Sequence, residues 1–515
     1  MTFIAETLAD LPAVAAQKFG EKLALVCGEV ALSFAEVDRR VSDRARELAA
    51  LGLGPGDHVI LHVRNGWEWV VAYYAIVRVG AAVVPANILL VPEEVGYIAS
   101  DCGAGAIIAP AEKREDIMRA DGAQRIKHYI TVTAEGTTEV KAEISSHRLA
   151  EDLGIEEVRP DSIAMISYTS GTTGVPKGAV LTHRSIMLNV QMTSTMHMRS
   201  DQDVIVTALP FAHVYGYVVL NSVFLCGSTL VIFERFNTSL LLSAVQKHRA
   251  TLLDGVPTMY CYLLACKEIT SYDLTSLTRC TVGGQTMAIS QMMEIEESLG
   301  CPLLELWGMT ELAGLGTTHP LYGPRRLGSV GVPMPFIECR IAAIDDPTRV
   351  LGFDEVGELM VRGPTMMLKY WGAPEETDEA IYNGEWLHSG DVGYRDKDGY
   401  YYIIDRSRDM IITAGYNIYP SEIEKVISQM PAVLMVGVGP ISDANKGELP
   451  KAYIVLKNSE DCTVQDVMSH CRAHLASYKL PRQVEFVKEL KRTSSGKIIR
   501  HQLQNASRED QSEFS

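Results

Sequence analysis

Short apolar runs alternate with longer amphipathic patterns from the start of the chain to about residue 400. The runs Val59–Val63 and Ala106–Ile108 predict buried strands, and the apolar spacing in Phe34–Leu51 and Leu240–His248 predicts helices. Strands that alternate with helices are typical of layered α/β folds with mostly parallel sheets. We therefore expect a large N-terminal domain made of α/β layers.

The period of the pattern changes towards the end of this domain. Val356–Arg362 and Gly399–Ile404 alternate between apolar and polar residues, with Gly and Asp turns between them. A period of two with short turns is typical of antiparallel strands. The large domain is therefore expected to have a β-rich, antiparallel end.

A dense charge cluster, Asp405-Arg406-Ser407-Arg408-Asp409, then separates two apolar strands. Beyond it the pattern predicts a compact unit of helix, strand, strand and helix over Pro420–Gln429, Val433–Val438, Ala452–Leu456 and Val464–Leu475. We predict a large domain over 1–405, a hinge at 406–408 and a small α+β domain over 409–515. No internal repeat is evident.

Composition and charge narrow the functional class. With 515 residues, 47% of them hydrophobic and 22% charged, the chain has a globular composition and the length of about three domain-sized units. A net charge of −17 argues against a nucleic-acid partner. Residues 406–500 hold 14 Lys/Arg against 10 Asp/Glu, so the small domain could bring cations to a phosphorylated ligand. A solvated mixture of charges would give the same balance.

Two apolar stretches could be mistaken for membrane spans. Val70–Val91 carries Arg78 near its middle, where a charge is costly in hydrocarbon. Leu209–Phe233 contains prolyl and glycyl residues, and its second half, Ser228–Phe233, is rich in β-forming residues. A buried helix followed by a buried strand explains this stretch better than a transmembrane helix.

The cysteines and the N-terminus indicate the compartment. The 10 cysteines are scattered without a Cys-x-x-Cys pair, and the first 20 residues carry Glu6 and Asp10 but no basic leader. We expect reduced thiols and a cytoplasmic protein. The oligomeric state cannot be inferred from this pattern, and a homodimer is the default expectation.

Residues 168–178, Tyr-Thr-Ser-Gly-Thr-Thr-Gly-Val-Pro-Lys-Gly, are the most informative motif. Hydroxyl side chains alternate with glycines that can turn backbone amides towards an anion, and Lys177 adds a positive charge. A Walker loop requires Gly-Lys followed by Ser or Thr, which fails both here and at Gly496-Lys497-Ile498. The candidate phosphate-binding residues are Thr169, Ser170, Gly171, Thr172, Thr173, Gly174 and Lys177. A solvated loop between strands is the alternative.

The whole string resembles the phosphate loop of the adenylate-forming superfamily, which includes acyl-CoA synthetases, luciferases and the adenylation domains of nonribosomal peptide synthetases. Trp307-Gly308-Met309-Thr310-Glu311 resembles the second signature of this family. The resemblance implies that Trp307 faces adenine, Thr310 touches the α-phosphate and Glu311 holds Mg²⁺. These residue types suit those roles, since an indole offers a flat surface and a carboxylate is a ligand for Mg²⁺.

Three further segments match the family in order along the chain. Gly283-Gly284-Gln285 is placed beside the adenine, although paired glycines are also common in turns. Asp391 is assigned to the ribose hydroxyls, and Arg406 is expected to face the same sugar and phosphate. His213, in Pro210–Gly216, borders the acyl pocket and the carboxylate; a histidine buried in a core remains the alternative.

The resemblance also assigns roles near the C-terminus. Lys497, in Arg492–Ile498, matches the catalytic lysine, whose ammonium would bridge the attacking carboxylate and the α-phosphate. Arg408 occupies the hinge position, and Ala414, Gly415 and Tyr416 are expected to line the channel for coenzyme A. Some positions depart from the family pattern, namely Glu305, Leu306, Arg408 and Lys491, so one half-reaction could be weakened.

The implied activity is a two-step ligation. A carboxylic acid and MgATP give an acyl-adenylate and pyrophosphate, and the thiol of coenzyme A then displaces AMP. The small domain is expected to rotate about the hinge between the two steps, so that one site serves both. ATP, Mg²⁺ and coenzyme A are therefore the expected cofactor and co-substrates.

The acid itself is less constrained by the sequence. Apolar or small residues are expected to form its pocket, among them Val214, Tyr215, Val218, Gly283, Gly308, Gly314 and Leu315. No cation is evident for a second carboxylate, which favours a monocarboxylic acid. A medium- or long-chain fatty acid is the first expectation, and a benzoate- or cinnamate-like acid is the second.

Other functions remain open at the level of sequence. An acyl-AMP ligase that feeds a carrier protein would share every ATP motif, and so would a luciferase-like oxygenase. A non-catalytic acyl- or nucleotide-binding relative is the alternative outside enzymes. The presence of both Glu311 and Lys497 weighs against this last class.

Overall fold

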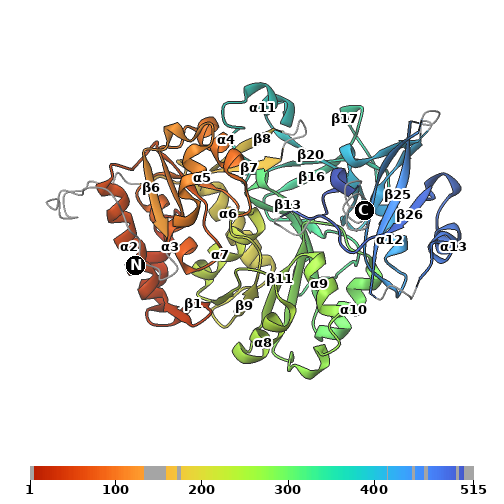
Figure 1. The fold of residues 1–515 in the computed structure, drawn as a ribbon, viewed down its shortest axis with the longest axis horizontal. Helices are drawn as coiled ribbons and strands as arrows, with labels where there is room; N and C mark the ends of the chain where they lie inside the picture. The colour runs from red at the N-terminus through yellow and green to blue at the C-terminus, as the bar shows by residue number, and fades with distance from the viewer. Residues whose placement is uncertain are drawn as a thin grey trace, which may run out of the picture.

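The computed structural model describes residues 5–132, 158–170, 175–413, 416–443, 447–457, 462–493 and 498–503. Within these residues the chain forms sheets of nine, six, six and five strands. Figure 1 shows the N-terminal layers on one side of the molecule and the small C-terminal domain on the other. The predicted large α/β domain and small α+β domain are both present.

The N-terminal sheet has six strands in the order β6-β5-β3-β4-β7-β8. Its neighbours are parallel except β7 and β8, which form an antiparallel pair. The strands are β3 (His58–Leu61), β4 (Ala82–Pro85), β5 (Ala106–Pro110), β6 (His128–Val132), β7 (Ile163–Ser170) and β8 (Pro176–Thr182). The two strands predicted near residues 59 and 106 are confirmed.

The central sheet has nine strands in the order β15-β14-β13-β12-β11-β9-β10-β1-β2. It is parallel from β1 to β13 and antiparallel at both ends. The strands are β1 (Leu23–Cys27), β2 (Val30–Ser33), β9 (Val204–Thr207), β10 (Thr229–Ile232), β11 (Leu252–Gly255), β12 (Arg279–Gly283), β13 (Leu303–Met309), β14 (Gly314–Thr318) and β15 (Val332–Pro333). The parallel majority agrees with the predicted fold class.

Helices pack on these two sheets, mostly through one large apolar core, while the helices Pro92–Cys102 and Arg114–Arg119 belong to a second apolar cluster with β5. They are α1 (Leu11–Phe19), α2 (Phe34–Ala50), α3 (Trp67–Arg78), α4 (Pro92–Cys102), α5 (Arg114–Arg119), α6 (His183–Met196), α7 (Val214–Cys226), α8 (Thr238–His248), α9 (Pro257–Leu264) and α10 (Ile289–Leu299). Helix α2 starts where predicted because Ser33 and Glu36 form a capping box.

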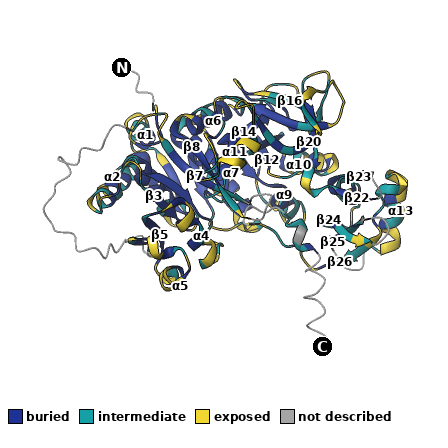
Figure 2. Cartoon of the chain, turned by 90° about the horizontal axis from the view of Figure 1, so that it is seen from above, coloured by how far each residue is buried: buried dark blue, intermediate teal, exposed yellow. Residues whose placement is uncertain are grey.

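The apolar stretch Leu209–Phe233 contains helix α7 and strand β10, as predicted. Every residue of α7 from Val214 to Phe224 is buried, so this helix is apolar on all sides because it lies inside the core (Figure 2). Arg78, in the other apolar stretch, ends α3 and donates to the Asp38 carboxylate at 2.7 Å. Among the described residues, no helix is long and apolar enough to cross a membrane.

The large domain ends in an antiparallel sheet of six strands, which confirms the change of period seen in the sequence. Its strands are β16 (Glu338–Ala343), β17 (Asp346–Val350), β18 (Gly357–Arg362), β19 (Ile381–Tyr382), β20 (Trp386–Arg395) and β21 (Tyr401–Arg406), with helix α11 (Pro374–Ala380) beside them. Strand β21 leads directly into the predicted hinge.

The small domain has its own sheet and its own apolar core. The sheet order is β23-β22-β25-β24, with β26 beside β25. The elements are β22 (Ile411–Thr413), β23 (Tyr416–Ile418), α12 (Pro420–Ile427), β24 (Val433–Asp443), β25 (Gly447–Leu456), α13 (Val464–His474) and β26 (Gln483–Phe486). The predicted helices and strands are all present, and β24 and β25 are longer than expected.

Candidate active site

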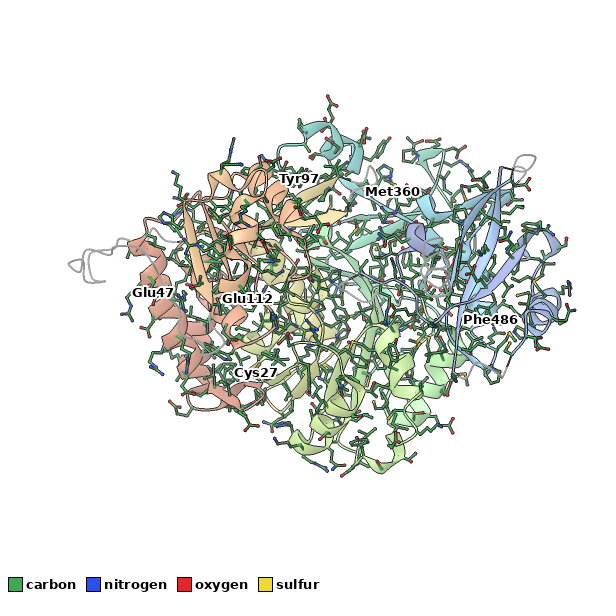
Figure 3. The ribbon with its side chains drawn as sticks, viewed as in Figure 1. Cys27, Glu47, Tyr97, Glu112, Met360 and Phe486 are labelled. Carbon is green, nitrogen blue, oxygen red and sulfur yellow. The ribbon has the colours of Figure 1, made fainter. Side chains whose placement is uncertain are left out.

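The predicted phosphate loop joins the antiparallel strands β7 and β8. Thr169 and Lys177 lie opposite each other in this pair. The hydroxyl of Tyr97 on α4 donates to the Pro176 carbonyl at 3.1 Å, which holds the start of β8 against the N-terminal layer (Figure 3). The loop residues Gly171, Thr172, Thr173 and Gly174 and the side chain of Ser170 lie outside the described residues, so their role stays a prediction.

Residues 367–371, here called the bridging segment, connect the phosphate-loop strand to the second signature. The Trp371 amide donates to the Gly178 carbonyl at 2.7 Å, and Val180 exchanges two backbone hydrogen bonds with the segment, each 2.9 Å long. At its start, the segment donates an amide to the Glu311 carbonyl at 2.7 Å. The segment thereby connects the strand that carries Lys177 to the turn that carries Glu311.

Glu311 lies in a turn after β13 and is 7% exposed. The Tyr370 hydroxyl donates to Glu311 Oε1 at 2.7 Å. Burial and the nearby Glu311 charge raise the pKa of Tyr370, so its hydroxyl remains a donor. Lys177 Nζ lies 5.8 Å from the centre of the Tyr370 ring and 3.9 Å from Glu376. Thr310 opens the turn that carries Glu311.

Trp307, Asp391 and Arg406 form a connected group beside this turn. The indole Nε1 of Trp307 donates to Asp391 Oδ2 at 2.7 Å, and Arg406 Nε lies 3.1 Å from Asp391 Oδ1. Asp391 and Arg406 are direct partners across β20 and β21, so sheet register sets their distance. The carboxylate of Asp391 raises the pKa of Arg406. The three residues predicted to bind adenosine are therefore in contact.

The predicted adenine-side glycines follow β12. Gly283 ends this strand, Gly284 is exposed with φ +94°, and Gln285 is partly buried. A Cβ on Gly283 would lie 2.2 Å from Leu306 Cδ1. The space beside Gly283 is thus filled by Leu306, which stands where the family pattern has glycine. A small residue at 283 is a packing requirement of this chain.

A narrow apolar cavity of about 30 Å³ opens between α7, β13 and β14. It is lined by Leu209, Pro210, His213, Val214, Tyr215, Val256, Gly284, Leu306, Gly308, Gly314 and Leu315. Of the residues predicted for the acyl pocket, Val218 and Gly283 do not line this cavity, and Val218 is fully buried in the core. His213 caps α7, and its Nδ1 accepts from the Tyr215 amide at 3.3 Å. Trp307 and Met309 belong to β13, next to this cavity.

Behind the cavity, Tyr215 joins a buried polar network. Its hydroxyl pairs with the Thr281 hydroxyl, and Thr281 donates to Asp254 Oδ1 at 2.5 Å. Arg199 donates to the same oxygen at 2.7 Å, and both charged side chains are fully buried. Because Asp254 already pairs this guanidinium, the network offers no spare cation to a second carboxylate of a substrate.

The hinge and the lysine loop can be located only in part. Arg408 lies in a short 3₁₀ turn, is 43% exposed and faces Asp409 at 3.7 Å. Lys497, Ala414, Gly415 and the side chain of Tyr416 lie outside the described residues. Their assigned roles therefore stay predictions.

The described residues also fit the cofactors that the motifs imply. No cluster of three or more metal-ligating side chains occurs among the residues that the structure describes. Mg²⁺ needs no such cluster when it is bound with a nucleotide, because phosphates and water supply most of its ligands. Glu311, oriented by Tyr370 near the phosphate-loop strand, can supply the single carboxylate.

Comparison with known families decides what this arrangement is. The family model for AMP-binding enzymes matches residues 13–371, and the model for the AMP-binding enzyme C-terminal domain matches residues 422–497. The chain belongs to the AMP-binding enzyme family. It is an AMP-forming acid–thiol ligase of the acyl-CoA synthetase branch, with ATP, Mg²⁺ and coenzyme A as cofactor and co-substrates. The predicted family, fold and enzyme class are thus confirmed.

The names of similar proteins specify different acid substrates. The chain is 31% identical to a long-chain-fatty-acid–CoA ligase of Bacillus subtilis, over 97% of this chain and 94% of that protein. It is 34% identical to a feruloyl-CoA synthase of Amycolatopsis sp, over 92% and 94%. The crystal structure of the anthranilate CoA ligase AuaEII with anthranoyl-AMP superposes with a TM-score of 0.87 at 26% identity, over 98% of each chain.

One neighbour is informative about the arrangement of the whole chain. MatB from Rhodopseudomonas palustris, 29% identical over 98% of each chain, superposes with a TM-score of 0.85 in its ATP-bound crystal structure and 0.77 in its apo structure. The present structure therefore resembles the nucleotide-bound form more closely.

Sequence reasoning missed Tyr370, which contacts Glu311 and lies under Lys177. The bridging segment that carries it has no glycine-rich or charged signature. Its only signal is the aromatic pair Tyr370-Trp371 before a glycine, at the end of an apolar run.

Proposed function

We propose that this acyl-CoA synthetase activates a monocarboxylic acid whose acyl group is apolar and compact, of the size of a single ring or a medium-length chain. MgATP and the acid give an acyl-adenylate at the Trp307–Asp391–Arg406 group, and coenzyme A then takes the acyl group as a thioester. Lys497 assists the first step, and rotation about Arg408 brings Ala414–Tyr416 to the second.

The observation that carries this proposal is the lining of the cavity. Among the described residues that line it there is no Asp, Glu, Lys or Arg, and the polar side chains are those of His213 and Tyr215. A charged group on the acyl chain would be buried there without a partner, at a cost of several kcal/mol. Arg199, the buried cation of the network behind Tyr215, is already paired with Asp254.

The size limit comes from the walls of the cavity. Leu306 occupies the space over Gly283. The ring of Tyr215 is fixed because its hydroxyl is hydrogen-bonded to the Thr281 hydroxyl behind the cavity. Gly316 does not deepen the cavity, because a Cβ there would lie 2.4 Å from the Trp307 ring. Compact acyl groups are therefore favoured.

A long-chain fatty acid is the second candidate. Long-chain-fatty-acid–CoA ligases match 97–98% of this chain, and a long chain would require Leu306 to swing away from Gly283. Rotation of a leucine side chain is accessible at room temperature, so this candidate differs from the first only in acyl length.

A substrate panel distinguishes the candidates. Pyrophosphate release and acyl-CoA mass are measured with MgATP and coenzyme A for linear acids of increasing length, benzoic and cinnamic acids, and a dicarboxylic acid. We expect thioesters from the ring acids or medium chains and none from the dicarboxylic acid. Thioester from the dicarboxylic acid would contradict the proposal, and a maximum at long chains would favour the second candidate.

The variant Leu306→Ala tests directly whether Leu306 limits the length of the acyl group. It should move the preference towards longer acids by opening the space over Gly283. Leu303→Ala, three residues earlier on β13 and also buried, is the matched control, because each substitution removes a buried leucine at a cost of about 2–5 kcal/mol. Equal length profiles in both variants would show that Leu306 does not set acyl length.

A further inference from the structure

The two segments that flank the loop predicted to carry the catalytic lysine are hydrogen-bonded to each other. Arg492 and Ile498 form an antiparallel bridge, and the Ile499 amide donates to the Lys491 carbonyl at 3.0 Å. These contacts close the loop on the N-terminal and C-terminal sides of Lys497. The two described stems of this loop are therefore held to each other.

The C-terminal stem is held by Arg500, three residues after Lys497. Its Nη1 donates to Asp405 at 2.7 Å and to Asp409 at 2.9 Å, and its Nη2 donates to Glu424 at 2.8 Å. The Nε donates to the second oxygen of Glu424 at 3.3 Å. One guanidinium thus binds three carboxylates, which lie before the hinge, at the hinge and on α12.

Asp405 is the partner of Arg500 from the large domain. It precedes Arg406 on β21, and its carboxylate is 4% exposed. One oxygen accepts from Arg500, and the other accepts from the Ser421 amide of α12 at 2.8 Å. The Ser421 hydroxyl also donates to the Ile404 carbonyl. Asp405 is therefore where the small domain attaches to the end of β21.

The N-terminal stem also contacts the large domain. The Arg492 guanidinium lies 5.4 Å from the centre of the Tyr262 ring on α9. Tyr262 packs against an apolar cluster of the small domain that includes Leu490 and Leu503. Both described stems of the lysine loop thus contact residues that lie outside the small domain's own sheet, Asp405 through Arg500 and Tyr262 through Arg492.

We propose that Arg500 is a positioning residue for adenylate formation: its ion pair with Asp405 holds the small domain against the end of β21 during this step and breaks when the small domain turns for thioester formation. This inference rests on the proposed function, since it needs two half-reactions in one site. It assigns a role to Arg500 and Asp405 that the motifs do not give them.

The arrangement of charges makes the ion pair between Arg500 and Asp405, here called the latch, reversible. Asp409 and Glu424 lie on the small-domain side of the predicted hinge, so they stay beside Arg500 when Asp405 is left behind. The guanidinium then keeps two carboxylates, and Asp405 exchanges its partner for water. Breaking the latch therefore leaves no buried charge unpaired, the case that would be most costly.

The test measures each half-reaction separately. Adenylate formation is followed as pyrophosphate release from MgATP and the best acid of the panel, without coenzyme A. Thioester formation is followed from the synthetic adenylate of that acid and coenzyme A. The variants are Arg500→Met, Arg500→Lys and Asp405→Asn, each checked for a wild-type melting curve. Lys479→Met, which removes a 2.8 Å pair with Glu422 inside the small domain, is the control.

We expect Arg500→Met and Asp405→Asn to slow adenylate formation about ten-fold or more, because a small displacement of a catalytic group is enough for such a loss. Thioester formation should be unchanged or faster, Arg500→Lys should recover part of the first step, and Lys479→Met should change neither. If Arg500→Met does not fold, Asp405→Asn decides alone, since it leaves Arg500 paired with Asp409 and Glu424.

An equal loss of both half-reactions in Asp405→Asn would show a structural role and overturn the latch. Unchanged adenylate formation in that variant would overturn it as well. A wild-type protein that performs neither half-reaction would instead overturn the proposed function, and the latch with it. The two failures are therefore distinguishable by the wild-type measurement.

Discussion

Glu311 and Tyr370 show how one hydrogen bond can orient a carboxylate that we propose as the ligand of Mg²⁺. The carboxylate is nearly buried, and the phenol fixes one of its oxygens at 2.7 Å. A ligand held in place by its neighbour binds a metal more tightly than a mobile one. The variant Tyr370→Phe should therefore raise the Mg²⁺ concentration for half-maximal pyrophosphate release about ten-fold or more.

The control for this change is Tyr402→Phe. Tyr402 donates to Asp396 at 3.2 Å, away from the site, so the loss of its hydroxyl should leave the Mg²⁺ dependence unchanged. If both variants titrate with Mg²⁺ like the wild type, Tyr370 does not orient the metal ligand.

Glu305 illustrates how burial controls a charge. It is 6% exposed, and burial raises its pKa to about 8, with Lys425 of α12 and the Gly328 amide partly opposing the rise. A carboxyl whose pKa is raised by folding stabilises the protein fully below its unfolded pKa. That stability is lost as the pH rises towards 8.

The variant Glu305→Gln should remove this loss, because it keeps an acceptor for the Gly328 amide but cannot ionise. We expect its free energy of unfolding at pH 8.5 to exceed that of the wild type by on the order of 5 kcal/mol, since a rise in pKa from 4.5 to about 8 is worth 1.36 kcal/mol per pKa unit, and its melting temperature to be higher. The difference should shrink below pH 5. Glu338→Gln, at an exposed carboxylate, is the control; a similar pH-dependent gain there would contradict the argument.

At the scale of elements, α6 shapes the turn that carries the second signature. Asn189, fully buried on α6, donates to the carbonyls of Leu312 and Leu315 at 3.1 and 2.9 Å and accepts from the Leu315 amide at 3.0 Å. A Cβ on Gly314 would lie 2.1 Å from the Asn189 Oδ1. The glycine after the signature therefore allows α6 to approach the turn.

The elements themselves were largely predictable from the sequence. Helices α2 and α12 start at the predicted residues, because a capping box and a proline mark their first turns. Contacts between distant elements were not predictable in the same way. Neither the pairing of Leu306 with Gly283 nor that of Tyr370 with Glu311 leaves a local pattern, since each joins residues far apart in the chain.

At the scale of the whole molecule, described side chains of the large domain meet the small domain through both polar and apolar contacts. Asp405 provides a charged contact, and Tyr262 on α9 provides an apolar one. The second contact buries a ring against the small-domain cluster and places Arg492 over its face. Side-chain contacts of this kind can break and form again, which suits the proposed rotation of the small domain between the two half-reactions.

The variant Tyr262→Ala should therefore loosen the small domain without unfolding either domain. We expect trypsin to cleave the hinge several-fold faster at Arg408, whose side chain is already 43% exposed, because the population of detached domains rises with each contact removed. Tyr272→Ala is the control, since Tyr272 packs on the core of the large domain instead. Equal cleavage rates in the two variants would mean that Tyr262 does not hold the domains together, and the N-terminal stem of the lysine loop would then need another anchor.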